Sequence, residues 1–393
     1  MSEETVSNLA AFVKGIEQTG FPFEFETVQM LLADNWTVIS NKYYIDNENS
    51  TPREIDIVAY KVEITPRVTV ATALIVSCKK SESGTWAFLT RAINTGDPNS
   101  NWTPLHTWTN NRALQYLSQQ DSFAESYYRS VQLDAPDSVL QTPDYDVFAF
   151  QEMTEIDGAK KGASLDVAKV KGDSTIFASI ITLMKAQAYE LSAREDKAAR
   201  RKSKKPLLYQ FNLVGACDLD FVKLHFSSDP ISPSRPDLIS YVGRYMFNGK
   251  ETFSRISFAT KSALPKLIRR FSDLHKKNVS HFTAIENDFY DNWTEDYEKR
   301  RYLSRLFIDD LAKRITNASK DKEEAISVDL NSKTEPFIFI SEKRDLATIW
   351  LYGVNEDQVA ALNDDSRVAK LTKAALKEYF RHEGDFVFTE APF

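Results

Sequence analysis

The sequence predicts an α/β fold, with a mixed β-sheet core flanked by helices and a mainly helical α/β module at the C-terminal end. Residues 23–82 pass from a helical pattern to three strand-like runs, which is typical of a sheet packed under helices. Val70 to Cys78 is nearly all apolar, as expected of a central strand covered on both faces. With 42% apolar and 12% aromatic residues, the 393-residue chain can bury a sizeable core.

Charge and cysteine content exclude several classes of protein. The formal net charge of −7 argues against a protein that coats nucleic acid with its whole surface, although a local basic groove is compatible with it. Cys78 and Cys217 are the only cysteines, which excludes a disulfide framework and suits a reducing compartment. No apolar run reaches the ~18 residues of a membrane span, and the first residues lack a signal-peptide pattern. We therefore expect a cytoplasmic protein that does not bind membranes.

Two helices are predicted before the first strand. Residues 6–19 form an amphipathic lead-in helix, Gly20 breaks it, and Pro22 lies in the first turn of the next helix, where its missing N–H does no harm. Helical spacing predicts that the buried face of this second helix consists of Phe25, Val28, Leu31 and Leu32. Glu24 and Glu26 are about 200° apart around a helix, so only one of them can face a given site.

Three strands are predicted next, at residues 36–45, 54–62 and 70–78. Side chains alternate between the two faces of a strand, so one face of the second strand should carry Glu54, Asp56 and Val58. The same rule predicts that one face of the third strand carries Ile75, Ser77 and Lys79. Acidic and basic side chains therefore occur at the ends of neighbouring strands.

The remaining chain is predicted to complete the core and add a module. An irregular insertion is expected around residues 96–170, followed by a helix at 175–191. Further strands are predicted at 207–214, 219–226, 238–247 and 252–259. We place a domain boundary near residue 278, which gives a first domain at 1–277 and a largely helical module at 278–393.

A basic segment lies at the end of the helix predicted at 175–191. It contains Lys197, Arg200, Arg201, Lys202, Lys204 and Lys205. Such a segment can contact a phosphate backbone, with Lys80 as a further cation, and each contact makes the affinity depend on salt. It can equally be a solvated helix end, where positive charge is favourable. Both interpretations remain open from the sequence.

The acidic and basic residues of the first domain have the types that phosphodiester hydrolysis requires. A hard cation such as Mg²⁺ or Mn²⁺ is bound by carboxylate and carbonyl oxygens, and a lysine can orient the attacking water. Glu24 and Asp56 could bind the metal, and Lys79 could act on the water. The backbone carbonyl of Cys78 is a further candidate ligand. Each residue alone is also compatible with an ordinary surface role.

The order of these residues carries a resemblance. The segments TGFPFEFETVQMLLADNWTV, YYIDNENSTPREIDIVAY and ALIVSCKKS resemble the PD-(D/E)XK nuclease superfamily, which has the restriction-endonuclease-like fold, and in particular its Mrr-like branch. The resemblance covers residues 19–90, with 174–260 completing the core, and implies roles for Glu24 on the helix, Asp56 on a strand and Lys79 on the next strand. It implies metal-dependent cleavage of DNA and a setting in restriction or phage defence.

One position departs from the family pattern, because Ser77 stands where the family has the glutamate of E-x-K. A serine hydroxyl is a weak, neutral ligand for Mg²⁺. The remaining ligands and water could complete the metal shell, or a second acid, Glu54 or Glu82, could substitute. Alternatively the site is inactive, and the protein is a nucleic-acid-binding or assembly subunit. The module at 278–393 could mediate homo-oligomerisation or bind a partner protein.

Overall fold

The computed structural model divides into two compact units. Unit 1 comprises Met1–Asn111 and Gln120–Thr283, and unit 2 comprises Arg112–Gln119 and Ala284–Phe393. The residues that the structure describes are 3–46, 50–133, 135, 137–154, 168–200, 205–227, 230–247, 249–291, 293–319, 337–340 and 346–391. Arg112–Gln119 thus belongs with the C-terminal unit, although the sequence placed this stretch in the insertion of the first domain.

Unit 1 is built on a 10-stranded mixed sheet, which confirms the predicted mixed α/β class. The main strand order is β1(Thr37–Ile45)-β2(Pro52–Ile64)-β3(Thr69–Ala92)-β7(Leu207–Phe226)-β10(Lys250–Thr260)-β9(Leu238–Phe247). β2 is antiparallel to both β1 and β3, β7 is parallel to β3, β10 is parallel to β7, and β9 is antiparallel to β10. Four strands branch from this path: β4(Thr107–Thr109), β5(Tyr145–Thr154), β6(Lys169–Gly172) and β8(Ser232–Ser234).

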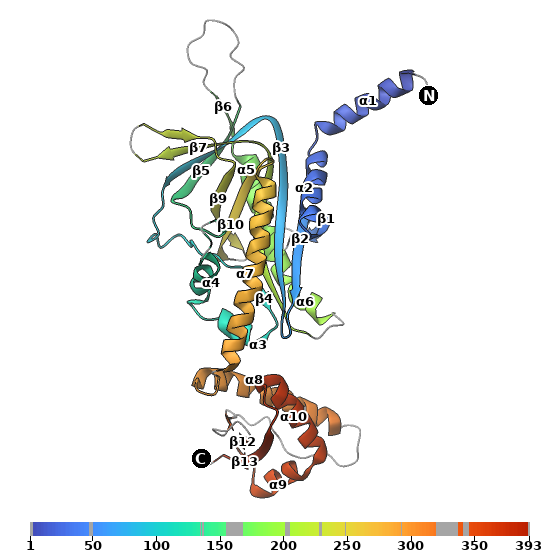
Figure 1. The fold of residues 1–393 in the computed structure, drawn as a ribbon, viewed down its shortest axis with the longest axis vertical. Helices are drawn as coiled ribbons and strands as arrows, with labels where there is room; N and C mark the ends of the chain where they lie inside the picture. Colours follow the sequence, from blue (N-terminus) through green and yellow to red (C-terminus); the bar gives the residue numbers. More distant parts are fainter. Residues whose placement is uncertain are drawn as a thin grey trace. The chain divides into compact units, whose positions relative to one another are not determined.

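Strand β3 is longer than the sequence predicted and runs along the sheet beside β2 (Figure 1). Its first half pairs with β2 and β7, and its second half pairs with β5 and β7. The register against β7 shifts between Lys80 and Thr85. Residues 81–84 therefore form a bulge opposite Leu219 alone, because Lys80 pairs with Asp218 and Thr85 with Asp220.

Helices cover both faces of the sheet in unit 1. On one face, α2(Phe21–Ala33) and α7(Leu264–Asp291) meet β3 and β7, where Leu31 and Leu267 surround a small void with Leu74 and Val214. On the other face, α5(Ser174–Ser192) packs Ile180 and Leu183 into one buried cluster with Ile75 and Leu213. Three further helices belong to this unit: α1(Glu3–Glu17), α4(Phe123–Gln132) and α6(Arg194–Ala199).

The buried face of α2 differs from the predicted one. Phe25 and Leu32 are 66% and 47% exposed, whereas the side chains buried against the sheet are Phe23, Thr27 and Leu31. These three follow the i, i+4, i+8 line of a helix. A threonine can occupy this line because its hydroxyl donates a hydrogen bond of 2.8 Å to the carbonyl of Phe23. The prediction failed because α2 has more apolar residues than its buried face can hold.

Unit 2 combines helices with a small sheet of its own. Its helices are α3(Arg112–Ser118), α8(Tyr297–Ser319), α9(Glu356–Asp364) and α10(Ser366–Phe380), and its core contains Phe289, Phe307, Ile349, Leu376 and Phe388. The sheet has the order β11(Phe337–Ile340)-β12(Leu346–Leu351)-β13(Asp385–Glu390). None of the described helices in either unit is long and apolar enough to cross a membrane.

Candidate active site

Asp56 lies where strands β2 and β3 separate. The antiparallel ladder between them ends at the pair Ile57 and Val76. Just beyond this pair, Oδ2 of Asp56 accepts a hydrogen bond of 2.7 Å from the backbone N–H of Cys78. The side chain thus replaces the ladder partner that β2 no longer supplies, and it is fixed at the opening between the two strands.

The strand around Asp56 departs from regular alternation. Ile55 and Val58 both pack into the buried cluster under α5, which a strict two-residue period does not allow. The prediction that Glu54, Asp56 and Val58 share one face is therefore wrong for this stretch. On the neighbouring strand, Asn41 has a positive φ of 51° and donates a hydrogen bond of 2.8 Å to Oε1 of Glu54. The irregularity lies on both strands at the position of the candidate site.

Glu24 reaches the same region from the first turn of α2. Burial raises the pKa of its carboxyl group, and the negative charges of Asp56 and Glu54 raise it further. The ammonium group of Lys79 acts in the opposite direction and lowers this pKa. Four charged groups from α2, β2 and β3 therefore influence one another, because the charges of Asp56, Glu54 and Lys79 all act on Glu24. These include Glu24, Asp56 and Lys79, the three residues that the sequence singled out.

Cys78 contributes its backbone to the site and not its thiol. Burial raises the pKa of the thiol to about 12, and the charges of Asp56 and Glu24 also raise it, so the sulfur is not a thiolate at neutral pH. In an extended strand, the N–H and the C=O of one residue point to the same edge. Because the Cys78 N–H is directed to Asp56, its carbonyl oxygen is directed to the same opening.

Ser77 is directed away from this group. Its side chain is 2% exposed and accepts a hydrogen bond of 3.5 Å from the hydroxyl of Ser179 on α5. Glu24, in contrast, belongs to α2, which covers the other face of the sheet. The structure therefore does not bring the Ser77 hydroxyl together with the carboxylates.

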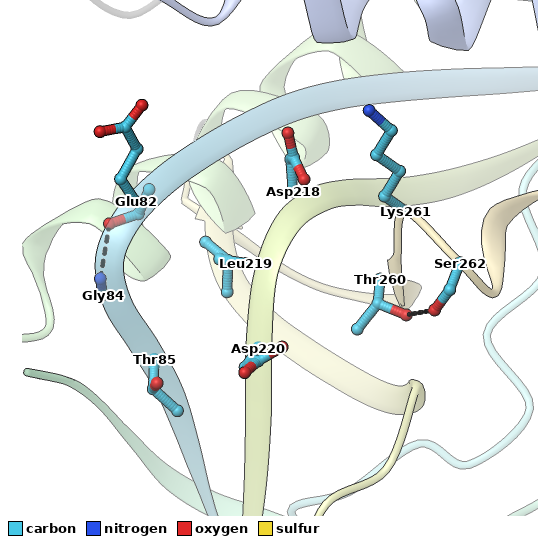
Figure 2. A pocket seen from close by; sticks show the side chains of 10 residues that line it. Glu82, Gly84, Thr85, Asp218, Leu219, Asp220, Thr260, Lys261 and Ser262 are labelled. Carbon is cyan, nitrogen blue, oxygen red and sulfur yellow. Dashed lines mark hydrogen bonds between the residues drawn. The ribbon is translucent and has the colours of Figure 1, made fainter. Parts of the chain in front are cut away.

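The remaining acidic candidates divide between two locations. Glu54 lies close enough to Glu24 to raise its pKa, so it belongs to the candidate site. Glu82 lies elsewhere, in a cavity of about 730 Å³ next to the β3 bulge (Figure 2). Glu26, the other acid of α2, forms an ion pair with Lys261, which also lines this cavity.

The cavity is at the carboxyl end of β10, beside the middle of β7 and the bulge of β3. Asp218 and Asp220 line it from β7, Thr260 lies at the end of β10, and Ser81 and Glu82 come from the bulge of β3 (Figure 2). Ligands of open α/β sheets bind at such ends. Glu24, Asp56 and Lys79 are absent from its lining, so the cavity and the candidate site are neighbouring but separate features.

The basic residues predicted to contact nucleic acid are partly engaged in contacts within the protein. Lys80 donates a hydrogen bond to the carbonyl of Glu17 at the end of α1, and Lys205 donates one of 2.9 Å to the carbonyl of Thr65. Arg200 is exposed at the end of α6. The other three predicted residues lie outside the described residues: Arg201, Lys202 and Lys204.

Comparisons with known proteins add no relative. No protein-family model, curated protein or solved structure matches this chain.

The donor chemistry of the site fits a hard divalent cation. Carboxylate and carbonyl oxygens are the ligands that Mg²⁺ prefers, and Glu24, Asp56 and the Cys78 carbonyl supply them. Burial is the main cause of the raised pKa of Glu24, the charges of Asp56 and Glu54 add to it, and a bound cation would favour the ionised form. Within the described parts of the chain, no group of three or more His, Cys, Asp or Glu side chains is arranged to hold a metal ion. A cation would therefore keep several water or phosphate ligands, as Mg²⁺ commonly does.

Sequence reasoning missed one cluster of charged residues on the α5 face. Glu190 of α5 is fully buried and contacts Lys42 of β1, Arg194 and Lys197. Lys42 and Glu190 are 148 residues apart in the sequence, so no local pattern connects them. Glu190 is the only acid of α5, and this was the one signal available in the sequence.

Proposed function

We propose that this protein is a metal-dependent nuclease that hydrolyses phosphodiester bonds, with DNA as the substrate. The observation that carries the proposal is the electrostatic influence of Asp56 and Lys79 on Glu24, with Asp56 fixed at the opening between β2 and β3. This chemistry needs acids that can bind a metal ion and a lysine that can act on the attacking water or the developing charge, and two acids and one lysine supply these groups. The acids come from a helix and a strand that are far apart in sequence, which makes a chance grouping of charges a weaker explanation.

The connectivity of unit 1 supports the same proposal. Helix α2 is followed by the antiparallel strands β1, β2 and β3, then by α5 and by β7, which is parallel to β3. The sequence resemblance to restriction-endonuclease-like proteins implies a mixed sheet with a helix and strands at 174–260 that complete the core. Helix α5 and strand β7 occupy this range. The more specific fold assignment remains part of the proposal.

Each residue has a defined task in the proposed reaction. When bound, the cation would stabilise the charge that develops on the phosphate and lower the pKa of a bound water. Glu24, Asp56 and the Cys78 carbonyl would hold it. The Cys78 N–H fixes Oδ2 of Asp56, which leaves Oδ1 as the oxygen for the cation. Lys79 would orient the attacking water or stabilise the developing charge.

The serine at the family's glutamate position needs a substitute in this proposal. Glu54 is the better candidate, because its charge acts on Glu24, whereas Glu82 lines the separate cavity. The Asn41 side chain holds Oε1 of Glu54, so Oε2 is the atom that would face the cation or its water shell. Ser77 itself is assigned no catalytic task in this mechanism.

A second candidate function is a nuclease-fold subunit that binds nucleic acid or a partner protein without cutting. Two observations favour it: Ser77 is directed to α5, and the described residues contain no ready-made group of three metal ligands. Unit 2 would then serve assembly, as a homo-oligomer or with a partner. The setting in restriction or phage defence and a cytoplasmic location are part of either proposal and depend on analogy.

A plasmid-nicking assay with Mg²⁺ or Mn²⁺ tests the first function against the second. Wild type should cut, while Asp56→Ala and Lys79→Ala should lose about 100-fold or more of the rate. Glu26→Gln is the matched control, because it changes an acid of the same helix whose partner is Lys261. A wild-type protein that binds DNA without cutting it would favour the second function, and unchanged cutting by both alanine variants would remove this site from consideration.

A further inference from the structure

We propose that Lys42 and Lys197, organised around Glu190, form a binding site for a phosphate group. This inference rests on the proposed function for its ligand, which is a backbone phosphate of the nucleic acid. Both lysines lie outside the group of Glu24, Asp56 and Lys79. The site would bind the substrate and would not take part in the chemical step.

Glu190 is the centre of the site. Its side chain is fully buried and faces four donors. Oε1 contacts the ammonium groups of Lys42 and, at 3.5 Å, Lys197. Oε2 contacts the guanidinium of Arg194 and accepts a hydrogen bond of 3.2 Å from the Tyr60 hydroxyl. Both carboxylate oxygens are therefore occupied.

The charges of this cluster do not balance. Three cations share one carboxylate, so the cluster carries a net charge of +2 when all groups are ionised. Among the described residues, Glu190 is the sole ion-pair partner of Lys42, Arg194 and Lys197. Partly buried positive charge without a counter-charge is unfavourable. An anion with several acceptor oxygens would neutralise it, and a phosphate group has that chemistry.

The two lysines and the arginine have different tasks. The Arg194 side chain is 6% exposed, and its guanidinium lies 4.3 Å from the centre of the Tyr209 ring, so it positions Glu190 and cannot reach a ligand. The side chains of Lys197 and Lys42 are 41% and 19% exposed. Lys197 makes the loosest contact with Glu190 and has three donors, so it is the main ligand residue.

The electrostatic state of the lysines supports this assignment. Burial, together with the positive charges of Lys42 and Arg194, lowers the pKa of Lys197 to about 7. Burial and the charge of Arg194 also lower the pKa of Lys42. Glu190 is the acid that faces these groups, and the rings of Tyr189 and Tyr209 also lie near them. A bound phosphate would favour the charged form of both lysines.

The location connects this site to the proposed substrate. On β1, Lys42 pairs in register with Ile55, the residue before Asp56. On the helical side, Lys197 lies in α6, which leads into the basic segment at 200–205. Lys42 thus belongs to the strand next to the one that carries Asp56, and Lys197 belongs to the helix that follows α5.

Binding of a labelled DNA duplex to the Asp56→Ala protein, which keeps the substrate intact, tests the site. Lys197→Gln should weaken affinity about 3- to 10-fold and make the slope of log K against log salt shallower by about 0.9, the value for one phosphate contact. Lys197→Arg keeps the charge and should retain the affinity. Lys276→Gln is the control, because this exposed lysine of α7 pairs only with Asp273, three residues away.

The pH dependence of DNA affinity distinguishes a phosphate-binding site from a cluster of charges that only stabilises the fold. Wild-type affinity should fall between pH 6 and 8 as Lys197 loses its proton, since its pKa is about 7. Lys197→Gln and Lys197→Arg should both lack this fall, because neither side chain titrates there. An unchanged salt slope and pH profile in Lys197→Gln, with folding intact by circular dichroism, would overturn the proposal.

Inorganic phosphate distinguishes a nucleic acid from a small phosphate compound. Inorganic phosphate should compete weakly with the duplex for binding to wild type, and still more weakly for binding to Lys197→Gln. The competition is weak because one phosphate ion replaces only one contact of a polyanion. Tight competition by phosphate with no effect of Lys197→Gln on duplex affinity would overturn the nucleic acid assignment. These measurements need no cutting. A protein that fails the nicking assay but shows the Lys197 effect would retain this site and lose the nuclease proposal.

Discussion

Oδ2 of Asp56 accepts a 2.7 Å hydrogen bond from the backbone N–H of Cys78, across the point where β2 and β3 separate. This bond fixes one carboxylate oxygen on a strand and leaves the other oxygen for a ligand. It also ties the candidate acid to the residue directly before Lys79. Two of the proposed catalytic groups therefore keep a fixed spacing without any contact between their side chains.

Substitutions at Asp56 should separate charge from structure. Asp56→Asn keeps an acceptor for the Cys78 N–H, so its free energy of unfolding should stay within about 1 kcal/mol of wild type, whereas its cutting rate should fall about 100-fold or more. Asp56→Ala also loses the hydrogen bond and should be less stable than Asp56→Asn by about 1 kcal/mol. Urea unfolding and plasmid nicking measure both quantities. Wild-type cutting by Asp56→Asn would contradict a metal-binding role.

Glu24 should destabilise the protein at neutral pH. Its pKa is raised in the folded state by burial and by the charges of Asp56 and Glu54, so folding favours its protonated form. The free energy of unfolding should therefore rise as the pH falls through the folded-state pKa. Glu24→Gln should unfold at a higher urea concentration than wild type at pH 7, and this gain should vanish below the ordinary glutamate pKa of 4.5.

The same variant tests the cation. Mg²⁺ should raise the urea midpoint of wild type, because ligand bound to the folded state stabilises it, and should raise that of Glu24→Gln much less. Glu26→Gln serves as the control, since it removes the ion pair with Lys261 and leaves the proposed ligands intact. An equal effect of Mg²⁺ on wild type and Glu24→Gln would contradict the assignment of Glu24 as a ligand.

Restoring the family's glutamate should harm the protein. Ser77 is 2% exposed and contacts Ser179 on α5, so Ser77→Glu would bury a carboxylate beneath α5, which costs free energy. We expect a loss of about 2 kcal/mol or more in the free energy of unfolding, and no gain of cutting. Ser77→Ala should be tolerated within about 1 kcal/mol. A folded Ser77→Glu protein that cuts faster would show that this position can turn to the metal.

Gly215 should be intolerant of a side chain. A Cβ atom at this position would lie 2.2 Å from Cδ1 and 2.5 Å from Cε1 of Phe258, a fully buried ring that cannot move aside. Gly215→Ala should therefore cost about 1–3 kcal/mol by overpacking. Gly15→Ala is the control, because nothing lies within 4 Å of its Cβ position in α1. Urea unfolding of the two variants tests the difference, and equal stability would mean that β7 and β10 can separate locally.

The sequence predicted the order of the elements better than their extents. The apolar run from Val70 to Cys78 marked a central strand because both of its faces are covered. The continuation of β3 to Ala92 was not predicted, because Ser81 to Gly84 interrupt the apolar pattern where the strand bulges. A polar, glycine-containing segment has the composition of a turn, and only the pairing with β5 and β7 shows that the strand continues.

The sequence indicated which residues could form the candidate site, but it did not indicate the directions in which their side chains point. Glu24, Asp56 and Lys79 were selected by their order along the chain, and the structure gives them a common electrostatic environment. The direction of Ser77 towards α5 depends on tertiary packing. The interrupted alternation at Asp56 depends on Asn41 of the neighbouring strand. Contacts between distant segments are invisible to a local pattern, and the cluster around Glu190 was missed for the same reason.

The bulge at residues 81–84 allows two parts of β3 to vary independently. The extra residues of the bulge lie opposite Leu219. The pairing of Lys79 with β7 on one side of the bulge is therefore independent of the pairing with β5 on the other side. Lengthening or shortening this segment would reshape the cavity beside it while the lysine keeps its place. Substitutions among the bulge residues can therefore change this cavity without moving the proposed site.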